Sequence, residues 1–332
     1  MPPRKEDLTR RAGADDAGRR LDKVLRRMFP SLGLSDIYGR LRKRTIRVNG
    51  ARAEPACRLA EGDLISFPAE LLTGGEDSTP PSEPIGSRNG SGLGGILVLE
   101  TRDLLFLNKP RGLLSHGPGG LDELVEAAMR DRIGMSLSFR PGPLHRLDRN
   151  TSGLITFPRT AEGSRAFSMM LRSRRIRKRY LALLDGVLDR ELLWEDRLVR
   201  DDRTRTSHAG AEAERSPDEA ARGRRAVSRI VPLIGSQGLC LAMIEIQTGL
   251  THQIRAQASL HGRPLAGDRK YGGSRHASGF LLHAHSMEFS EPPFDDVPRR
   301  VIASLPSEAS ERLASIFGPN EVEKAQSLAL MS

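Results

Sequence analysis

The sequence predicts an α+β protein of two domains, and three observations along the chain lead to this prediction. Near the N-terminus, apolar residues between 21 and 28 recur with helical spacing, and short extended segments flank the turn pair Asn49-Gly50. Residues 71–95 are rich in Gly, Ser and Pro and have little to bury, which predicts a flexible linker. From Ile96 onward, strand-like apolar segments alternate with a few helices.

The first domain is predicted over residues 19–70. Residues 1–18 before it are polar and charged, so we expect a loose N-terminal arm. A second short helix is expected over 34–41, with Ser35 as its N-cap, after the helix that begins near Arg19. Such a domain would be free to swing on the linker that follows it.

The second domain is predicted over residues 96–306, with a C-terminal tail over 307–332 that includes a short helix. It opens with the strand-like segments GILVLE and LLFLN, and an amphipathic helix is expected near residues 160–171. Residues 195–226 mix charged residues with Ala and lack a clear period. They therefore predict an exposed insertion.

The composition favours an anionic partner. The 332 residues carry a formal net charge of +10 and give a pI of about 10.2, which points to nucleic acid first. Only 4% of the residues are aromatic, which argues against a single-strand binder built mainly on stacked aromatic rings. Charge alone leaves open a basic protein with no polyanionic partner.

Neither a metal nor a membrane is expected from the residue pattern. Cys57 and Cys240 are far apart, which gives neither a metal-ligand spacing nor a disulfide framework. His283 and His285 alternate on one strand without Cys or acidic neighbours, so we interpret them as structural. The N-terminus MPPRKEDLTR lacks the apolar core of a signal peptide, and no stretch approaches the roughly 18 apolar residues of a membrane helix. A cytoplasmic location is predicted.

The first domain resembles a known RNA-binding module. The segments RRLDKVLRRMF, LSDIYGRLRKRTIRVNG and RLAEGDLISF resemble, in order and spacing, the small RNA-binding domain first described in ribosomal protein S-four. Cations concentrated in so short a region attract phosphates without needing base contacts. The alternative is a solvated basic helix face. The candidate RNA contacts are Arg20, Lys23, Arg44 and Arg47.

The most informative segment of the second domain is PLHRLDRNTSGLITF, residues 143–157. Asp148 lies there in a polar loop between Arg146 and Arg149. Nearby positive charge favours an ionised carboxylate, which suits a nucleophile or a general base. A structural Arg–Asp pair at a turn is the alternative, and this segment alone does not exclude it.

Within that segment, HRLDRNTSGL resembles the signature of the RluA-type family of pseudouridine synthases. Four further segments match that family in the same order, so that the resemblance covers residues 96 to about 300. It implies a central, mostly antiparallel mixed β-sheet with a cleft along one face. The four segments are NKPRGLLSH (108–116), RKRYLALLDG (177–186), TGLTHQIRAQASLHGRPLAGDRKYGG (248–273) and LLHAHSMEFSEPP (from 281).

The resemblance implies a reaction and three catalytic residues. Asp148 would be the nucleophile, Tyr180 would lie in the active site, and Arg255 would pair with the nucleophile. The implied reaction isomerises uridine to pseudouridine in structured RNA. It needs no cofactor, because no atom is gained or lost and no redox change occurs. The two-domain arrangement resembles members that modify large-subunit ribosomal RNA, with tRNA also possible and a monomer as the default.

Several residues near the signature are candidate substrate contacts. Arg146 could fill the stack that a flipped uridine vacates, since guanidinium planes stack on bases. His145 beside it joins this group. Lys178 and Arg179 end the cationic segment RSRRIRKR, which suits a phosphate track or, alternatively, a merely solvated surface.

Two departures from the family pattern concern details of RNA contact. Leu250 stands where the family usually has Arg, and Gln257 where it often has His. Two other functions are weighed against the predicted one. A non-catalytic ribosome assembly factor would not need Asp148, Tyr180 and Arg255 together, and a nucleoside hydrolase would need a second carboxylate, which does not adjoin the signature.

Overall fold

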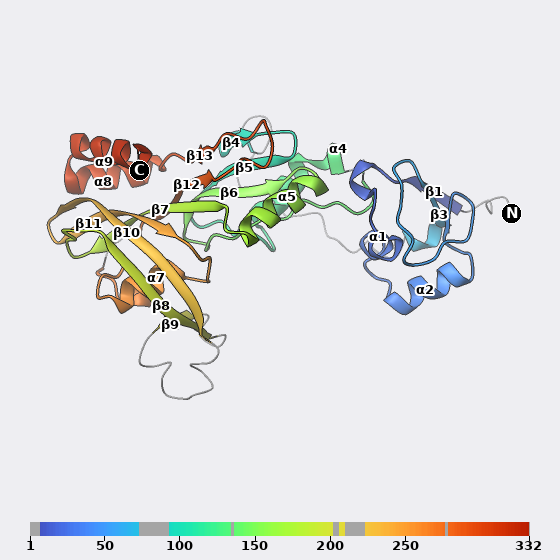
Figure 1. The fold of residues 1–332 in the computed structure, drawn as a ribbon, viewed down its shortest axis with the longest axis horizontal. Helices are drawn as coiled ribbons and strands as arrows, with labels where there is room; N and C mark the ends of the chain where they lie inside the picture. Colours follow the sequence, from blue (N-terminus) through green and yellow to red (C-terminus); the bar gives the residue numbers. More distant parts are fainter. Residues whose placement is uncertain are drawn as a thin grey trace.

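The computed structural model describes residues 7–72, 93–133, 136–201, 206–209, 223–275 and 278–331. Two sheets form within these residues, one of three strands and one of ten. Figure 1 shows the small three-stranded part (blue) at one end of an elongated molecule and the C-terminal helices (red) at the other. Both parts contain strands as well as helices, so the predicted α+β class is confirmed.

The small domain packs two helices on an antiparallel sheet of order β1-β3-β2. The predicted first helix forms because Leu21, Val24 and Leu25 fall on one face and become fully buried. Its core is closed by Phe29 and Phe67, whose rings meet edge to face at 5.0 Å. The elements are β1 (Asp7–Arg11), η1 (Ala14–Asp16), α1 (Leu21–Met28), α2 (Leu34–Arg42), β2 (Arg47–Val48), β3 (Leu64–Pro68) and η2 (Ala69–Leu71).

The small domain begins earlier than the sequence predicts. Residues 7–18 were expected in a loose arm, but Asp7–Arg11 pair with β3 and Asp16 is fully buried. The side chains of β1 are largely exposed, so the strand is held by backbone hydrogen bonds rather than by an apolar pattern. Residues 1–6, like residues 73–92 of the predicted linker, lie outside the described residues.

The large sheet has the order β4-β5-β6-β12-β7-β11-β10-β8-β9, with β13 beside β12. Only the β6–β12 pair is parallel among the described strands, so the sheet is mixed and mostly antiparallel. Its strands are β4 (Leu97–Glu100), β5 (Leu104–Lys109), β6 (Ser152–Pro158), β7 (Ile176–Asp185), β8 (Leu192–Asp201), β9 (Thr206–Ala209), β10 (Arg224–Ser236), β11 (Leu239–Ile246), β12 (Leu282–Phe289) and β13 (Arg300–Ile302).

Helices cover both faces of this sheet, because its central strands bury side chains on both sides. On β6, Ile155 and Phe157 join one apolar cluster, and Leu154, directly before Ile155, joins another, as the two-residue period of a strand requires. The helices are α3 (Leu121–Ala128), α4 (Arg130–Ile133), α5 (Ala161–Arg172), α7 (Gln253–Leu260), η5 (Arg269–Tyr271), α8 (Ser307–Phe317) and α9 (Pro319–Met331).

Two predicted peripheral segments differ from expectation. The C-terminal tail forms two helices, α8 and α9, whose Leu313 and Val322 pack on Leu181 and Leu241 of the sheet. The predicted insertion over 195–226 is partly sheet: it contains the end of β8, the strand β9 and the start of β10. Residues 202–205 and 210–222 of that insertion lie outside the described residues.

The parallel contact between β6 and β12 requires a glycine. Gly153 has φ +110°, and a Cβ there would collide with the backbone of Ala284. This close approach follows directly on the loop that carries Asp148, so it fixes the position at which that loop enters the sheet.

No helix in the described part of the chain is long and apolar enough to cross a membrane. Over the same residues, no group of three or more His, Cys, Asp or Glu side chains is arranged to hold a metal ion.

Candidate active site

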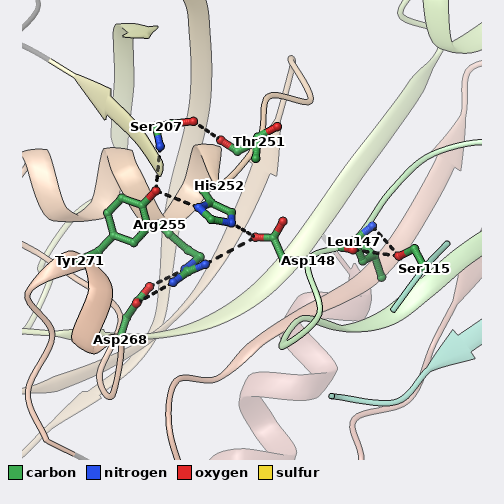
Figure 2. A network of polar contacts seen from close by, with 9 residues as sticks. All are labelled: Ser115, Leu147, Asp148, Ser207, Thr251, His252, Arg255, Asp268 and Tyr271. Atoms are coloured by element: carbon green, nitrogen blue, oxygen red, sulfur yellow. Dashed lines mark hydrogen bonds and ion pairs between the residues drawn. The ribbon is translucent and has the colours of Figure 1, made fainter. Parts of the chain in front are cut away.

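Asp148 lies on a loop that is fastened on both sides. Ser115 Oγ donates to the Leu147 carbonyl at 2.8 Å and accepts from the Leu147 N–H at 3.2 Å (Figure 2). Thr151 N–H donates back to the Asp148 carbonyl at 3.0 Å. The Asp148 side chain remains 27% exposed, so a substrate can reach a carboxylate whose backbone is held in place.

Lys109 holds the same loop through hydrogen bonds to backbone carbonyls. Its side chain is fully buried at the end of β5, and Nζ donates to the carbonyls of Pro110, Leu113 and Arg149 at 3.0, 2.8 and 3.2 Å. Burial lowers the pKa of Lys109 to about 8, and the Asp148 carboxylate partly opposes this shift. This lysine therefore ties the turn after β5 to the loop of Asp148.

Arg255, in the first turn of α7, reaches Asp148. Its Nη1 lies 3.8 Å from Asp148 Oδ2, within ion-pair distance but longer than a hydrogen bond. Its Nε and Nη2 donate to the two carboxylate oxygens of Asp268 at 2.6 and 2.8 Å. The guanidinium also lies over the rings of Tyr271 and Phe280, with its central carbon 4.8 and 4.6 Å from their centroids.

His252 approaches Asp148 from the same helix end. It precedes α7 in the left-handed conformation, φ 54°, and its Nε2 lies 3.7 Å from Asp148 Oδ2. Its Nδ1 and the Tyr271 hydroxyl are 2.9 Å apart, and that hydroxyl also accepts from the Ser207 N–H at 3.0 Å. With its hydrogen on Nε2, the imidazole accepts from Tyr271 and presents an N–H to Asp148. Figure 2 shows His252 and Arg255 converging on this carboxylate.

Burial lowers the pKa of His252, although Asp148 raises it in part. The cations Arg255 and Lys270 lower it further. The ring is therefore neutral at neutral pH, and Arg255 supplies the formal positive charge that faces Asp148. Sequence reasoning assigned no role to Asp268 or Tyr271, although both lie in the matched segment 248–273.

Tyr180 lies on β7 near this group. Its ring is 7% exposed and belongs to the same apolar cluster as Leu147. Burial, with the negative charge of Asp148, raises the pKa of its hydroxyl above the ordinary value. Tyr180 is thus a neutral phenol at the edge of the site, which suits packing against a base better than accepting a proton.

The predicted substrate contacts fall into two groups. Arg146 is exposed two residues before Asp148, and Lys178 is half-buried, with burial lowering its pKa. His145 instead turns inward: its Nε2 accepts from the Thr156 N–H at 3.1 Å and its ring stacks on Phe167. Burial lowers the pKa of His145 to about 3. This placement does not suit the expected contact of His145 with RNA.

Arg179 also differs from its expected role. Its side chain is 4% exposed and lies between Glu245 of β11 and Glu288 of β12, at 3.0 and 3.1 Å. The strand period turns Arg179 away from the face that carries Lys178. Its charge is committed to two carboxylates, so it is not positioned to bind phosphate.

The four predicted RNA contacts in the small domain also differ in their ion pairs and exposure. Arg20 pairs with Asp22 at 2.8 Å, and Arg47 pairs with Asp7 at 3.1 Å. Lys23 and Arg44 are exposed, and Arg44 adopts the left-handed conformation, φ 59°. Arg20 is also exposed despite its ion pair, so Arg47 is the one predicted contact of this domain that is largely shielded from a polyanion.

Leu250 and Gln257, the two residues that depart from the family pattern, lie away from Asp148. Gln257 is fully buried in α7, accepts from Ser228 Oγ at 2.6 Å and donates to Asp196 at 2.7 Å. Leu250 packs against the cluster that contains Tyr271. Both residues join α7 to strands β8–β10, so they support the helix that carries Arg255 and do not contact Asp148.

Comparison with known proteins finds similarity to one class of RNA-modifying enzymes. A family model described as RNA pseudouridylate synthase matches residues 103–260. Similar curated proteins include ribosomal large subunit pseudouridine synthase C of Escherichia coli K12, 28% identical over 303 residues, covering 86% of this chain and 89% of the relative. The protein of the same name from Haemophilus ducreyi is 29% identical over 332 residues, covering 89% and 94%.

Solved structures show a similar fold. Human RNA pseudouridylate synthase domain containing 4 aligns with a TM-score of 0.53 at 18% identity, over 70% of this chain and 94% of that one. Human RNA pseudouridylate synthase domain containing 1 aligns with a TM-score of 0.51 at 22% identity, over 66% and 86%.

Proposed function

The chain belongs to the RluA-type RNA pseudouridylate synthase family, and we propose that Asp148 starts its conversion of uridine to pseudouridine in RNA. The match confirms the family resemblance seen in the sequence motifs. The observation that carries the role of Asp148 is its accessible carboxylate, with Arg255 Nη1 at 3.8 Å and His252 Nε2 at 3.7 Å.

The reaction needs an ionised, oriented carboxylate. Uracil leaves carbon 1′ of the ribose through nitrogen 1, rotates and rejoins through carbon 5, so that atoms and oxidation state are conserved. Asp148 acts either by adding to carbon 1′ or by taking the proton of carbon 2′, and the carboxylate form serves both routes. Arg255 places a positive charge 3.8 Å from that carboxylate and helps to orient it.

Arg255 is itself held in a fixed orientation. Both carboxylate oxygens of Asp268 accept from it, and two aromatic rings lie against it. A guanidinium fixed on three sides keeps its remaining N–H groups directed at Asp148 without reorganising during the reaction. Tyr180, as a neutral phenol next to this group, would pack against the flipped uracil.

Two other functions are less well supported by this arrangement. A nucleoside hydrolase needs a second accessible carboxylate. Asp268 is the other carboxylate bonded to Arg255, but it is 1% exposed and both of its oxygens are occupied by that side chain. A non-catalytic assembly factor has no use for a buried Arg–Asp pair directed at a third carboxylate, because burying charges carries a desolvation cost.

The proposed substrate is large-subunit ribosomal RNA. The relatives from Escherichia coli and Haemophilus ducreyi are named for the ribosomal large subunit, and the chain covers most of the length of both. The excess of Lys and Arg gives the protein the charge that a large RNA requires. The proposal includes a cytoplasmic monomer, with tRNA as the substrate to be tested beside ribosomal RNA.

The test maps pseudouridine at nucleotide resolution in large-subunit ribosomal RNA, in precursor particles and in tRNA, after incubation with the protein. Asp148→Asn keeps the shape of the side chain and should lower the single-turnover rate by roughly 10³-fold or more. Asp189→Asn, at an exposed position, is the control and should keep the wild-type rate. Absence of pseudouridine in all three substrates, or an active Asp148→Asn variant, would contradict the proposal.

A further inference from the structure

The small domain docks on the large one through η1. Asp16 accepts hydrogen bonds from Ser136 Oγ and Ser138 Oγ at 3.0 and 2.5 Å, and from the N–H groups of Leu137 and Ser138 at 2.8 and 3.1 Å. Leu137 also packs against the apolar core of the small domain. A fully buried carboxylate with four donors from the other domain fixes where the two domains meet.

Asp15 makes a second polar contact between the domains. Its Oδ1 accepts from the N–H of Ala161 at 2.7 Å, the first residue of α5. Thr160 caps the same helix by accepting from the Gly163 N–H at 3.0 Å. Helix N-termini leave donors free and favour negative charge, so the end of α5 is a suitable anchor for Asp15. These contacts oppose the free swinging that the sequence predicts for the small domain.

A cavity of about 590 Å³ lies where the docked domains meet. Its walls come from Arg19 and α1 on one side, and from residues 138–140 and α5 on the other. Six cationic side chains line it and no carboxylate does. They are Arg19, Lys23, Arg26 and Arg27 of the small domain, with Arg140 and Arg165 of the large one.

The periodicity of α1 produces this concentration of charge. Lys23, Arg26 and Arg27 are three and four residues apart and share the face opposite the buried Leu21 and Val24. Of the six cations, only Arg140 has an ion pair within the part of the chain that the structure describes, with Glu126 at 3.6 Å. Like charges gathered without carboxylates favour the binding of an anion.

We propose that this cavity binds consecutive phosphates of an RNA backbone, so that one strand contacts both domains at once. The inference rests on the proposed function, because it takes RNA as the substrate. The only aromatic side chain in the lining, Phe139, is buried, so the cavity offers cations to phosphates rather than rings to bases. Binding there would be independent of base identity and would position the RNA relative to Asp148.

The first experiment measures the affinity of the full chain for a large-subunit ribosomal RNA fragment at several salt concentrations. Arg26→Ala combined with Arg165→Ala should weaken binding about ten-fold and reduce the slope of log affinity against log salt by roughly one to two. As a control, Arg190→Ala removes one positive charge from an exposed position just before β8, across the sheet from α5, and should weaken binding less than two-fold. Equal effects of the cavity and control variants would overturn the proposal.

The second experiment tests whether docking forms the cavity. Ser138→Ala removes the hydrogen bond from Ser138 Oγ to Asp16, keeps the one from the backbone N–H, changes no charge and should weaken RNA binding several-fold. Asp16→Asn deletes a negative charge, so simple attraction predicts tighter binding, whereas loss of docking predicts weaker binding. Thermal unfolding verifies that each variant is folded. Tighter binding by Asp16→Asn with unchanged binding by Ser138→Ala would contradict a docked cavity.

A third measurement separates this inference from the proposed function. At limiting protein, the cavity variants should make pseudouridine more slowly than wild type, in proportion to their weaker RNA binding, because less RNA is bound near Asp148. If wild type makes no pseudouridine, the proposed function fails while the salt slopes still decide the cavity. If pseudouridine forms and the slopes do not change, the function stands and the cavity proposal fails.

Discussion

Asp268 holds Arg255 through two hydrogen bonds, 2.6 and 2.8 Å long, and both side chains are more than 90% buried. The same guanidinium extends a third nitrogen toward Asp148 at 3.8 Å. Asp268 therefore positions the Arg255 guanidinium near the proposed nucleophile, although Asp268 does not itself face the substrate.

Asp268→Asn should reduce the turnover number by roughly 10²-fold, because a misplacement of about 1 Å at a catalytic centre has effects of that size. The KM for RNA should change little, since Asp268 is buried away from any RNA contact. Single-turnover kinetics with the mapped substrate checks this. The half-buried Asp185, whose carboxylate accepts from Ser274, provides the control Asp185→Asn. A variant with a normal turnover number and a raised KM would contradict a positioning role.

The proximity of Asp148 and Arg255 could be anticipated from sequence, because several motifs occur in a family order and each brings a known segment to the site. The partner of Arg255, Asp268, could not be anticipated from sequence. Asp268 lies thirteen positions later in a loop, and no periodicity marks a loop carboxylate as the partner of a helix arginine. Tyr271 was missed for the same reason, since its contact with His252 depends on the turn η5.

Cationic segments gave misleading predictions where partners come from distant strands. The segment RSRRIRKR predicts a phosphate track or a solvated surface, but its last three cations lie on β7, where the strand period places Lys178 on the face opposite Arg177 and Arg179. The carboxylates that enclose Arg179 belong to β11 and β12, more than sixty residues away, so local charge counting does not reveal them. In contrast, the helical period of α1 correctly separates buried Leu and Val from exposed Lys and Arg.

Arg179→Met should destabilise the fold and leave RNA binding largely unchanged. It leaves Glu245 and Glu288 without their shared partner, and breaking a largely buried ion pair costs about 3 kcal/mol of unfolding free energy. Urea unfolding and the salt dependence of RNA affinity measure the two effects. Arg177→Met, at the exposed position two residues earlier, is matched in chemistry and strand and should scarcely affect stability. A lowered salt slope for Arg179→Met at unchanged stability would restore its predicted RNA contact.

Lys109→Met should affect both stability and catalysis. Methionine fills a similar volume but leaves three carbonyls, of Pro110, Leu113 and Arg149, without the Nζ donor. Loss of these bonds should lower the unfolding free energy by about 2–4 kcal/mol. The loop of Asp148 then loses an anchor, so the single-turnover rate should fall by roughly ten-fold even where the variant is folded. Unchanged kinetics in a folded variant would show that Ser115 alone suffices to hold the loop.

Acid should destabilise the protein through two buried histidines. Burial lowers the pKa of His145 to about 3, with Lys178 lowering it further, and burial lowers the pKa of His283 to about 4, with His285 adding to the shift. The unfolded chain, with a histidine pKa near 6.5, binds these protons first, so stability is full above pH 6.5 and falls as the pH drops toward these values.

At pH 4 the loss should be roughly 3 kcal/mol for each of these histidines relative to pH 7. His145→Gln keeps an acceptor for the Thr156 N–H but cannot titrate, so its unfolding free energy should fall less steeply with acid than that of wild type. Urea unfolding at pH 7, 5.5 and 4 gives both slopes, and the difference between them cancels the contribution of the carboxylates. Parallel slopes would mean that the His145 imidazole gains its proton as easily in the folded protein as in the unfolded chain.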